Sequence, residues 1–326
     1  MSRLVLVTGA TGFAGSSVME ALLAAGYQVR IPVRPVSNRR WLPATGIDLV
    51  PADLRDPDSL RELVRDVSWV FHFGGVTRVP TREGYFQVNT EGTIQLYRIA
   101  AEQDQFELFL FCSSLAASGP APSADRPRTE EDPPAPRTPY GESKLAAERW
   151  LLDQSRPGRR LVIVRPPAIY GPRDVALLEL MTWARRGWLP LPAPRGSLVS
   201  IIHARDLAAA CLLLAEREAA GIFHASDGGF YSWESVGELL GDYFGRPLRR
   251  VRIPSAAIRL AGWWGELVGK LTGRQPVINR DKVEDILQPY WICSVDKLRG
   301  VGFEPRVGVA DGMRETLEWY RQEGWL

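Results

Sequence analysis

Three polar side chains, Ser114, Tyr140 and Lys144, have the types and the order along the chain that a proton-transferring group needs. Tyr140 and Lys144 stand four residues apart in Tyr-Gly-Glu-Ser-Lys. Thr138 and Pro139 before them are typical of a helix start, so the two side chains are expected on one helix face. A phenol with a pKa of about 10 is a poor base, but an adjacent ammonium favours the phenolate. Ser114, just past an apolar run, could orient a substrate oxygen with which Tyr140 exchanges a proton.

A glycine-rich segment, Thr-Gly-Ala-Thr-Gly-Phe-Ala-Gly, follows the first apolar run and opens the first helical pattern. Its glycines allow a tight turn and a close backbone approach, and the free amides of the following helix can receive a pyrophosphate. The order of strand, turn and helix separates this motif from a glycine triplet used only for packing. We therefore predict a dinucleotide bound by Gly9, Thr11, Gly12 and Gly15, with hydride passing between its nicotinamide and the substrate at Tyr140.

Residues that follow the next apolar runs are candidates to bind the ribose and adenine of that dinucleotide. An acid after the second strand would accept the ribose hydroxyls of NAD, whereas a cation there can hold the 2′-phosphate of NADP. Arg34 occupies this place, so the sequence favours NADP(H) over NAD(H). Asp53, next to Leu54, follows a third apolar segment and could accept from the adenine amino group. Gly74 and Gly75 end another run, where missing side chains would let the cofactor cross the strand ends.

Strand-length apolar runs alternate with helical patterns through the first half of the chain, which is typical of an α/β fold with a doubly wound parallel sheet. The predicted strands are Leu4 to Val7, Gln28 to Val33, Trp69 to Phe73, Leu108 to Cys112 and Leu161 to Arg165. The predicted crossover helices are Ser16 to Ala25, Ser59 to Val64, Thr90 to Glu102 and Tyr140 to Asp153. Such a sheet brings the residues that follow its strands to one edge. The seven prolines of residues 119–139 predict an irregular loop beside that edge.

The composition is that of an ordinary globular protein and limits the classes of partner. Of 326 residues, 45% are apolar and 24% are charged, and 40 cations against 38 acids give a net charge of +2. That balance gives no reason to expect nucleic acid as a partner. The three cysteines show no metal-ligand spacing, so no metal is expected and a reducing compartment fits. The first residues lack the apolar length of a signal peptide or a membrane span, so cytoplasmic is the expected location.

The glycine and tyrosine motifs occur together with ADLRD, VNTEGT, FCSSLAASG and RPPAIYGPRD. In this combination the chain resembles the extended short-chain dehydrogenases/reductases, over roughly its first half and part of its second. The resemblance implies a Rossmann-type domain over residues 1–170 and a smaller, interleaved substrate-binding part over residues 171–326. Of that part, about 200–226 is expected to return to the main sheet. The resemblance also implies Ser114, Tyr140 and Lys144 as the catalytic group.

The resemblance adds cofactor-side residues and a partner. It implies that Asn89 lies beside the cofactor, that the amides of Phe13 and Ala14 bind the pyrophosphate, and that Pro167 and Ala168 line the nicotinamide. It further implies that Tyr140 and Lys144 contact the cofactor as well as the substrate. Such proteins are often homodimers, paired through the helices that correspond here to the third and fourth predicted crossover helices.

Departures from subfamily patterns narrow the expected reaction. Dehydratases of the family carry an Asp-Glu pair directly after the active-site hydroxyl residue, where this chain has Leu115 and Ala116. Many nucleotide-sugar epimerases have an asparagine where Ala168 stands. The Pro-Pro-Ala-Ile-Tyr-Gly form looks more like the branch of 3β-hydroxysteroid dehydrogenases and sterol and flavonoid-type reductases. We therefore expect hydride transfer at a secondary alcohol or ketone of an apolar, ring-bearing small molecule. A nucleotide-sugar epimerase is the first alternative, and a non-catalytic dinucleotide sensor is the second.

The remainder of the chain gives fewer signals. Asp206 is expected to cap a helix N-terminus and His203 to be a packed or hydrogen-bonded histidine. Residues 221–226 are expected to return to the main sheet as a strand. Trp263 and Trp264 lie in an apolar segment that carries too many charges for a membrane span. Burial against the main domain is their expected role, with an apolar substrate wall or a membrane-surface contact as alternatives.

Overall fold

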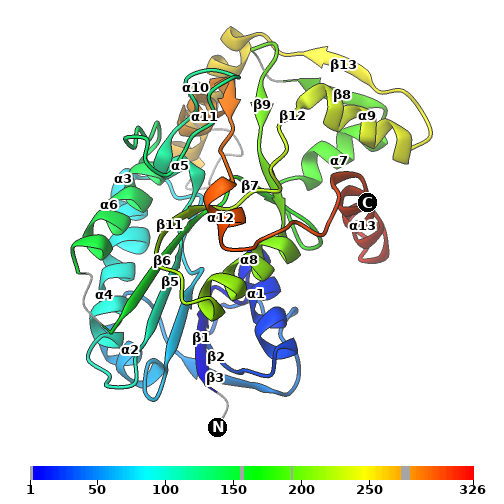
Figure 1. Cartoon of the computed structure of the whole chain (residues 1–326). Helices are drawn as coiled ribbons and strands as arrows, with labels where there is room; N and C mark the ends of the chain where they lie inside the picture. The colour runs from blue at the N-terminus through cyan, green and yellow to red at the C-terminus, as the bar shows by residue number, and fades with distance from the viewer. Residues whose placement is uncertain (1–2, 155–157, 192–193, 273–279) are drawn as a thin grey trace.

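A seven-stranded parallel sheet forms the centre of the computed structural model, which describes residues 3–154, 158–191, 194–272 and 280–326. The strand order is β11-β6-β5-β4-β1-β2-β3, and every neighbouring pair is parallel (Figure 1). The strands are β1 (Leu4–Thr8), β2 (Gln28–Val33), β3 (Ile47–Pro51), β4 (Trp69–His72), β5 (Leu108–Cys112), β6 (Arg160–Arg165) and β11 (Gly221–His224). From β1 the sheet grows outward in both directions, which confirms the doubly wound α/β fold.

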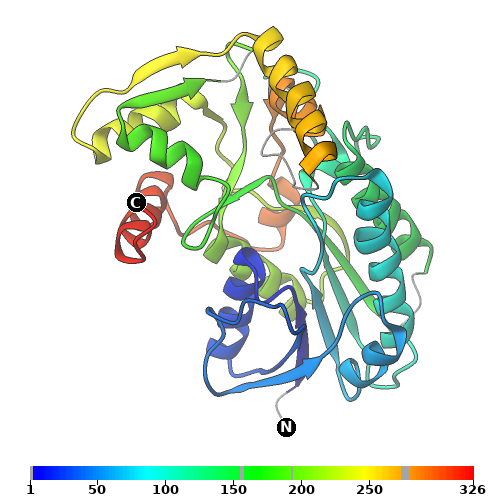
Figure 2. The same ribbon diagram turned by 180° about the vertical axis from the view of Figure 1, so that it is seen from behind.

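Alternate residues of each central strand supply two separate hydrophobic cores. In β1, Val5 and Val7 pack with α1 (Phe13–Ala24) and α8 (Ala204–Glu216). Leu6, between them, points to the opposite face. The helices on that face are α2 (Pro57–Leu63), α4 (Gly92–Ala100) and α6 (Pro139–Asp153). Figures 1 and 2 show these two helix layers on either side of the sheet, so the parallel strands are covered on both faces.

Three small sheets and a third core lie above the carboxyl ends of the main strands. The strand pairs are β7 (Ala168–Tyr170) with β10 (Ile201–His203) and β8 (Trp188–Leu191) with β13 (Arg249–Arg252). The third sheet consists of β9 (Leu198–Val199), β12 (Tyr231–Ser232) and β14 (Tyr290–Trp291). The third core joins α7 (Leu178–Arg185), α9 (Trp233–Tyr243) and α13 (Val309–Gln322). Because β11 returns to the main sheet after these segments begin, the two parts interleave, while the boundary at residue 170 stays a prediction.

Two regions near the strand ends are short and irregular. The predicted helix from Thr90 begins earlier, as α3 (Arg82–Tyr85) and the π-helix η1 (Phe86–Glu91), before it continues as α4. A π-turn inside a helix often marks a functional position, and Asn89 lies in this one. The proline-rich segment follows the short helix α5 (Leu115–Ser118) and has no regular element up to Thr138, as expected.

The expected role of Asp206 is wrong. This residue lies in the first turn of α8, but its carboxylate accepts from the backbone N–H groups of Arg306 and Val307, at 3.1 Å and 3.0 Å. His203 is the actual N-cap, and its Nδ1 accepts from the Arg205 amide at 3.3 Å. The reason is tertiary: a loop 100 residues further along brings two amides to the carboxylate. His203 itself is buried and hydrogen-bonded, as expected.

The expected burial of Trp263 and Trp264 is also wrong. Both lie in α10 (Ser255–Thr272), and their side chains are 51% and 54% exposed. Ile258 and Gly262 lie on the buried side of the helix, so the two tryptophans point away from the body of the protein. Within the described parts of the chain, no helix combines the length and apolar character needed to cross a membrane.

Candidate active site

The glycine turn between β1 and α1 leaves no space for side chains at Gly9 and Gly15. Gly9 has a φ of +76°, and a Cβ there would lie 2.6 Å from the Phe73 carbonyl. A Cβ on Gly15 would lie 2.3 Å from the Gly9 oxygen. Gly12 is the N-cap of α1 and offers no side chain to the first amides of the helix, those of Phe13 and the residues after it. These amides and the positive helix end fit an anionic group such as a pyrophosphate.

A buried polar chain links this turn to the next strand end. The Gly74 amide donates to Thr8 Oγ1 at 2.9 Å, and Thr8 Oγ1 lies 2.6 Å from His72 Nδ1. His72 Nε2 lies 2.9 Å from Thr93 Oγ1, which donates to the Asn89 carbonyl at 2.7 Å. Donors and acceptors balance along this chain if His72 is neutral with its proton on Nε2. Burial, followed by the charge of Lys144, lowers the pKa of His72 to about 3, which agrees with the neutral form.

Asn89 fastens the backbone that follows Gly74 and Gly75. Its Oδ1 accepts from the Val76 amide at 2.8 Å, and its Nδ2 donates to the Val76 carbonyl at 3.0 Å. A Cβ on Gly75 would lie 2.9 Å from this Oδ1, and a Cβ on Gly74 would lie 3.3 Å from Leu54 Cδ1. The three predicted residues Gly74, Gly75 and Asn89 therefore meet at the carboxyl end of β4, where a bound dinucleotide would cross the sheet.

Ser114 and Tyr140 come together from two different elements. Ser114 is the N-cap of α5, directly beyond β5, and Tyr140 lies in the first turn of α6. The Leu115 amide donates to the Pro166 carbonyl at 2.8 Å, which holds Pro167 and Ala168 beside the serine. The rings of Tyr85 and Tyr140 meet edge to face, with centroids 6.1 Å apart. The predicted hydroxyl pair is thus assembled at the strand ends.

The electrostatics of Tyr140 differ from the expectation. Burial, its largest influence, raises the pKa of the phenol, and a hydrogen bond with Ser114 acts in the opposite direction. The Lys144 ammonium donates to the Cys112 carbonyl at 2.9 Å and lies 4.6 Å from the centre of the Phe111 ring. Burial lowers the pKa of Lys144, because the interior disfavours its charge. The raised pKa favours the protonated phenol in this structure, and Lys144 is held by the Cys112 carbonyl.

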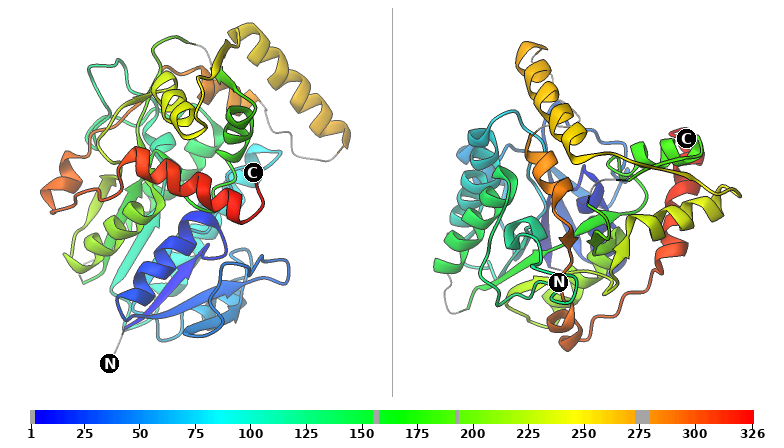
Figure 3. Two further views of the ribbon diagram at one scale, coloured as in Figure 1. Left: turned by 90° about the vertical axis from the view of Figure 1, so that its right-hand side faces the viewer. Right: turned by 90° about the horizontal axis from the view of Figure 1, so that it is seen from above.

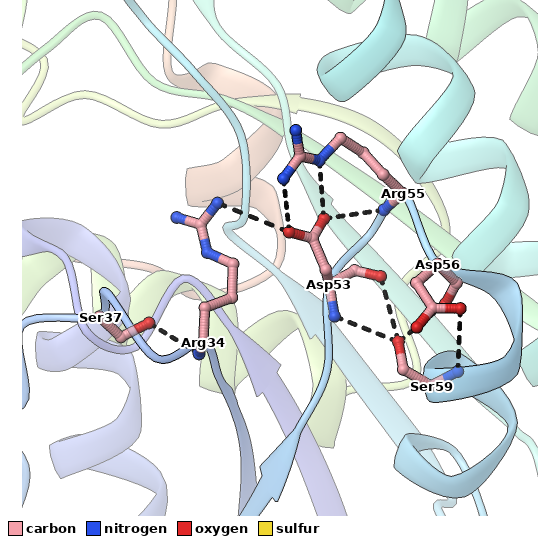
Figure 4. A network of polar contacts seen from close by, with 6 residues as sticks. All are labelled: Arg34, Ser37, Asp53, Arg55, Asp56 and Ser59. Carbon is pink, nitrogen blue, oxygen red and sulfur yellow. Dashed lines mark hydrogen bonds and ion pairs between the residues drawn. The ribbon is translucent and has the colours of Figure 1, made fainter.

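At the adenosine end, Arg34 and Asp53 face one another across the ends of β2 and β3. Figure 4 shows Arg55 binding Asp53 through two nitrogens, Nε to Oδ1 at 3.0 Å and Nη2 to Oδ2 at 2.8 Å. The Arg34 guanidinium is 3.9 Å from the same carboxylate, and its side chain is 53% exposed. Arg55, foremost, lowers the pKa of Asp53 to about 2. Arg55 thus occupies both carboxylate oxygens of Asp53, while Arg34 remains accessible to a ligand.

Two arginines near the candidate site, Arg173 and Arg165, were not singled out from the sequence. Arg173, within the Tyr-Gly-Pro-Arg segment, donates to Ser16 Oγ at 2.9 Å and pairs with Glu20 at 2.7 Å, which joins this segment to α1. Arg165 forms a buried ion pair with Glu148 of α6. Arg173 stands in a motif whose charge could have been noted, but nothing local to Arg165 identifies Glu148 as its partner.

The sheet, the glycine turn and the residues gathered at the strand ends define a dinucleotide-binding α/β protein of the Rossmann type. The chain belongs to the NAD dependent epimerase/dehydratase family, whose model matches residues 5–225. Its relatives are named reductases and epimerases, so it is an NAD(P)-dependent enzyme with oxidoreductase chemistry.

The similar proteins differ in the reactions for which they are named. The chain is 30% identical to the ceramide reductase of Caulobacter vibrioides, over 99% of this chain and 96% of that protein. It is 27% identical to a UDP-glucose 4-epimerase of Vibrio cholerae, over 99% and 97%. The solved UDP-glucose 4-epimerase of Thermus thermophilus, in complex with NAD, has a TM-score of 0.79 and 24% identity, and the match covers 98% of this chain and 99% of that one. That likeness supports the fold alone.

Proposed function

We propose that the protein is a reductase or dehydrogenase that transfers hydride between NADP(H) and a secondary alcohol or ketone of an apolar small molecule. The observation that carries this proposal is the pairing of Ser114 with the Tyr140 phenol at the carboxyl edge of the sheet. The 30% identity to a protein named ceramide reductase supports an apolar substrate. The exposed Ala168 at the same edge supports it further, since it offers no polar group.

In the direction of reduction, a nicotinamide held at this edge would supply the hydride for the carbonyl carbon. The Ser114 hydroxyl would orient the carbonyl oxygen, and the Tyr140 phenol would give it a proton, which completes the alcohol. The raised pKa of Tyr140 suits this role, because the phenol keeps its proton until the substrate oxygen gains charge. Lys144, held by the Cys112 carbonyl, would position the cofactor side of the site and help return a proton to the tyrosine.

The preference for NADP(H) rests on Arg34. Its half-exposed guanidinium lies just beyond β2, the place where a 2′-phosphate would come, and Ser37 accepts a hydrogen bond from its backbone at 2.9 Å. Arg55 already binds the carboxylate of Asp53. We therefore propose that Asp53 holds the loop beside Arg34 in place and does not contact the adenine directly. The homodimer through α4 and α6 stays a prediction, to be checked by sedimentation.

A direct assay distinguishes the proposed function from its rivals. Purified protein is mixed with NADP⁺ and one candidate substrate in each reaction: ceramide, a hydroxysteroid or UDP-glucose. Formation of reduced cofactor is followed by absorbance. Turnover with an apolar alcohol, reduced by about a hundredfold or more in Tyr140→Phe, is expected. Retention of NADPH binding by this variant would show that it is folded.

Epimerisation is the second candidate, favoured by the 27% identity to a UDP-glucose 4-epimerase along nearly the whole chain. It predicts conversion of UDP-glucose to UDP-galactose without net change in cofactor redox state. Full activity of Tyr140→Phe towards every substrate would refute the catalytic assignment and leave a dinucleotide sensor.

A further inference from the structure

The apolar face of helix α10 points away from the protein. Its large exposed side chains are Leu260, Trp263, Trp264 and Val268, each between 49% and 57% exposed. With about 3.6 residues per turn, these four positions fall on one side of the helix. The buried positions on the other side are Ile258 and Gly262. A helix that packs by its apolar face would show the reverse, so the exposed Leu260, Trp263 and Trp264 can contact another partner.

The geometry of the two tryptophans suits an interface between water and hydrocarbon. Their rings meet edge to face with centroids 6.3 Å apart, so the indoles form a single projection. Figure 3 shows α10 standing out from the body of the molecule, with β13 leading into it. Indole rings combine a large apolar body with a polar N–H group and are enriched at membrane surfaces.

Basic residues accompany this apolar face. Residues 249–272 contain five cations and one acid, a net charge of +4 in a chain whose total is +2. Three of the arginines pair with glutamates of neighbouring elements: Arg250 with Glu238, Arg252 with Glu234 and Arg259 with Glu284. Because these pairs are open to water, each is weak, and the guanidinium groups can exchange a carboxylate for a lipid phosphate. Arg249 lies 5.5 Å from the centre of the Trp188 ring.

Helix α10 also lies next to the proposed active site. It packs against α11 (Arg280–Leu287), which is joined to it by the Arg259–Glu284 pair at 3.7 Å. Asp285 of α11 is close enough to Tyr140 to raise the pKa of its phenol. Helix α11 therefore connects α10 to the surroundings of Tyr140.

We propose that α10 docks the enzyme on an anionic phospholipid membrane, with Leu260, Trp263, Trp264 and Val268 inserted among the headgroups and upper acyl chains. The helix has the pattern of an interfacial helix: one face with Trp and Leu, cations on and beside the other, and too many charges to span. The arginines of β13 contact the phosphates. Docking by this face places α10 between the bilayer and α11, on the side of the molecule where α11 approaches Tyr140. The contact itself does not depend on the reaction at Tyr140.

Vesicle sedimentation tests the docking surface directly. The full-length protein is mixed with vesicles of equal parts phosphatidylglycerol and phosphatidylcholine, and with phosphatidylcholine alone. We expect binding to the anionic vesicles that weakens with added salt, because part of it is electrostatic. Trp263→Ser/Trp264→Ser should reduce the partition coefficient at least about tenfold, because two inserted indoles are lost. Trp183→Ser, which removes a 43% exposed tryptophan of α7, is the matched control and should bind as the unchanged protein does.

Three further outcomes decide against the proposal. The unchanged protein could fail to bind anionic vesicles, or the double variant could bind as well as the Trp183 control. The double variant could also convert a dimer to a monomer in analytical ultracentrifugation without loss of vesicle binding, which would assign the face to a second copy of the chain. Since both indoles are half-exposed, thermal unfolding and NADPH binding should be retained in the double variant. Vesicle binding in Tyr140→Phe separates this proposal from the proposed function, since it is expected to persist even if the catalytic assignment fails.

Discussion

Both carboxylate oxygens of Glu148 accept from Arg165, Oε1 from Nε at 3.0 Å and Oε2 from Nη2 at 2.5 Å, in an ion pair whose side chains are 1% and 2% exposed. Ser113 donates to the same carboxylate, and Arg165 Nη1 donates to Ser118 Oγ at 2.9 Å. The pair thus fastens α6, which carries Tyr140, to the end of β6, and the Ser113 hydrogen bond fastens it to the end of β5, next to Ser114. A buried ion pair by itself adds little net stability, so we expect this pair to act mainly by holding α6 in position.

Loss of one partner should be severe. Arg165→Met leaves the Glu148 carboxylate buried without its cation, and we expect it to lower the free energy of unfolding by about 3–5 kcal/mol. Urea denaturation measures this change. The double variant Arg165→Met/Glu148→Leu, which removes both charges, should recover much of the loss. A single variant as stable as the double one would contradict the account.

Acid should destabilise the protein through its histidines. All three are buried, and burial, foremost, lowers the pKa of His72 to about 3, of His203 to about 4 and of His224 to about 3. Since unfolded histidines titrate near pH 6.5, the unfolded chain binds more protons below that value, and stability falls as the pH drops from about 6.5 towards 4. Above pH 6.5 the histidines are neutral in both states, so they no longer change the stability with pH. Each histidine adds a slope of up to about 1.4 kcal/mol per pH unit.

A single variant isolates this effect. Burial raises the pKa of Asp174 to about 6, so that residue acts in the opposite direction over part of the range. His203→Asn keeps an acceptor at the N-cap of α8 but removes one titrating group. Its stability should depend less steeply on pH than that of the unchanged protein in urea titrations between pH 7 and about pH 5. Equal slopes would mean that the pKa of His203 is the same in the folded and unfolded chain, contrary to its burial.

The glycine turn can be tested without touching the proposed catalytic group. In Gly15→Ala the new Cβ would lie 2.3 Å from the Gly9 oxygen, so the turn must open. NADPH affinity, measured by fluorescence titration, should fall at least about tenfold, because the amides no longer converge on the pyrophosphate. Gly300→Ala in α12 (Asp296–Gly300), where a Cβ meets no other group, is the control and should bind normally. Equal affinity in both variants would exclude the turn as the binding site.

Cofactor preference depends on one exposed side chain. Arg34→Ala should weaken NADPH binding about tenfold or more and leave NADH binding nearly unchanged, because only NADPH carries the 2′-phosphate. Arg61→Ala on α2, whose arginine is 63% exposed and pairs with Asp58, serves as the control. If Arg34→Ala affects both cofactors equally, the arginine supports the loop and does not select NADP.

The sequence predicted what short-range patterns encode. The ranges of β2 and β5 are the ones expected, and β1, β4 and β6 each differ from the predictions by one residue at one end. Tyr140 and Lys144 fall on one helix because a spacing of four residues is local information. The strand ends meet because parallel crossovers allow little else.

Partners that are distant in the chain could not be predicted. Asp206 has the composition of a cap, but its carboxylate binds a loop 100 residues away, and no local pattern contains that loop. Arg165 and Glu148 each look like ordinary charges of a strand and a helix. The exposure of Trp264 depends on which face of α10 meets the body, and two faces of an apolar helix differ little in sequence when glycine occupies the contact.

The late return of β11 to the sheet has a consequence for synthesis of the chain. Gly221 pairs with Val162, so the β6 edge has no neighbour while a ribosome is still producing the segments between them. During that interval the emerging polypeptide presents an open, apolar strand edge, which is a template for pairing with other nascent chains. Translation speed over residues 166–220 therefore sets how long this edge needs shielding, and a pause there would lengthen dependence on chaperones.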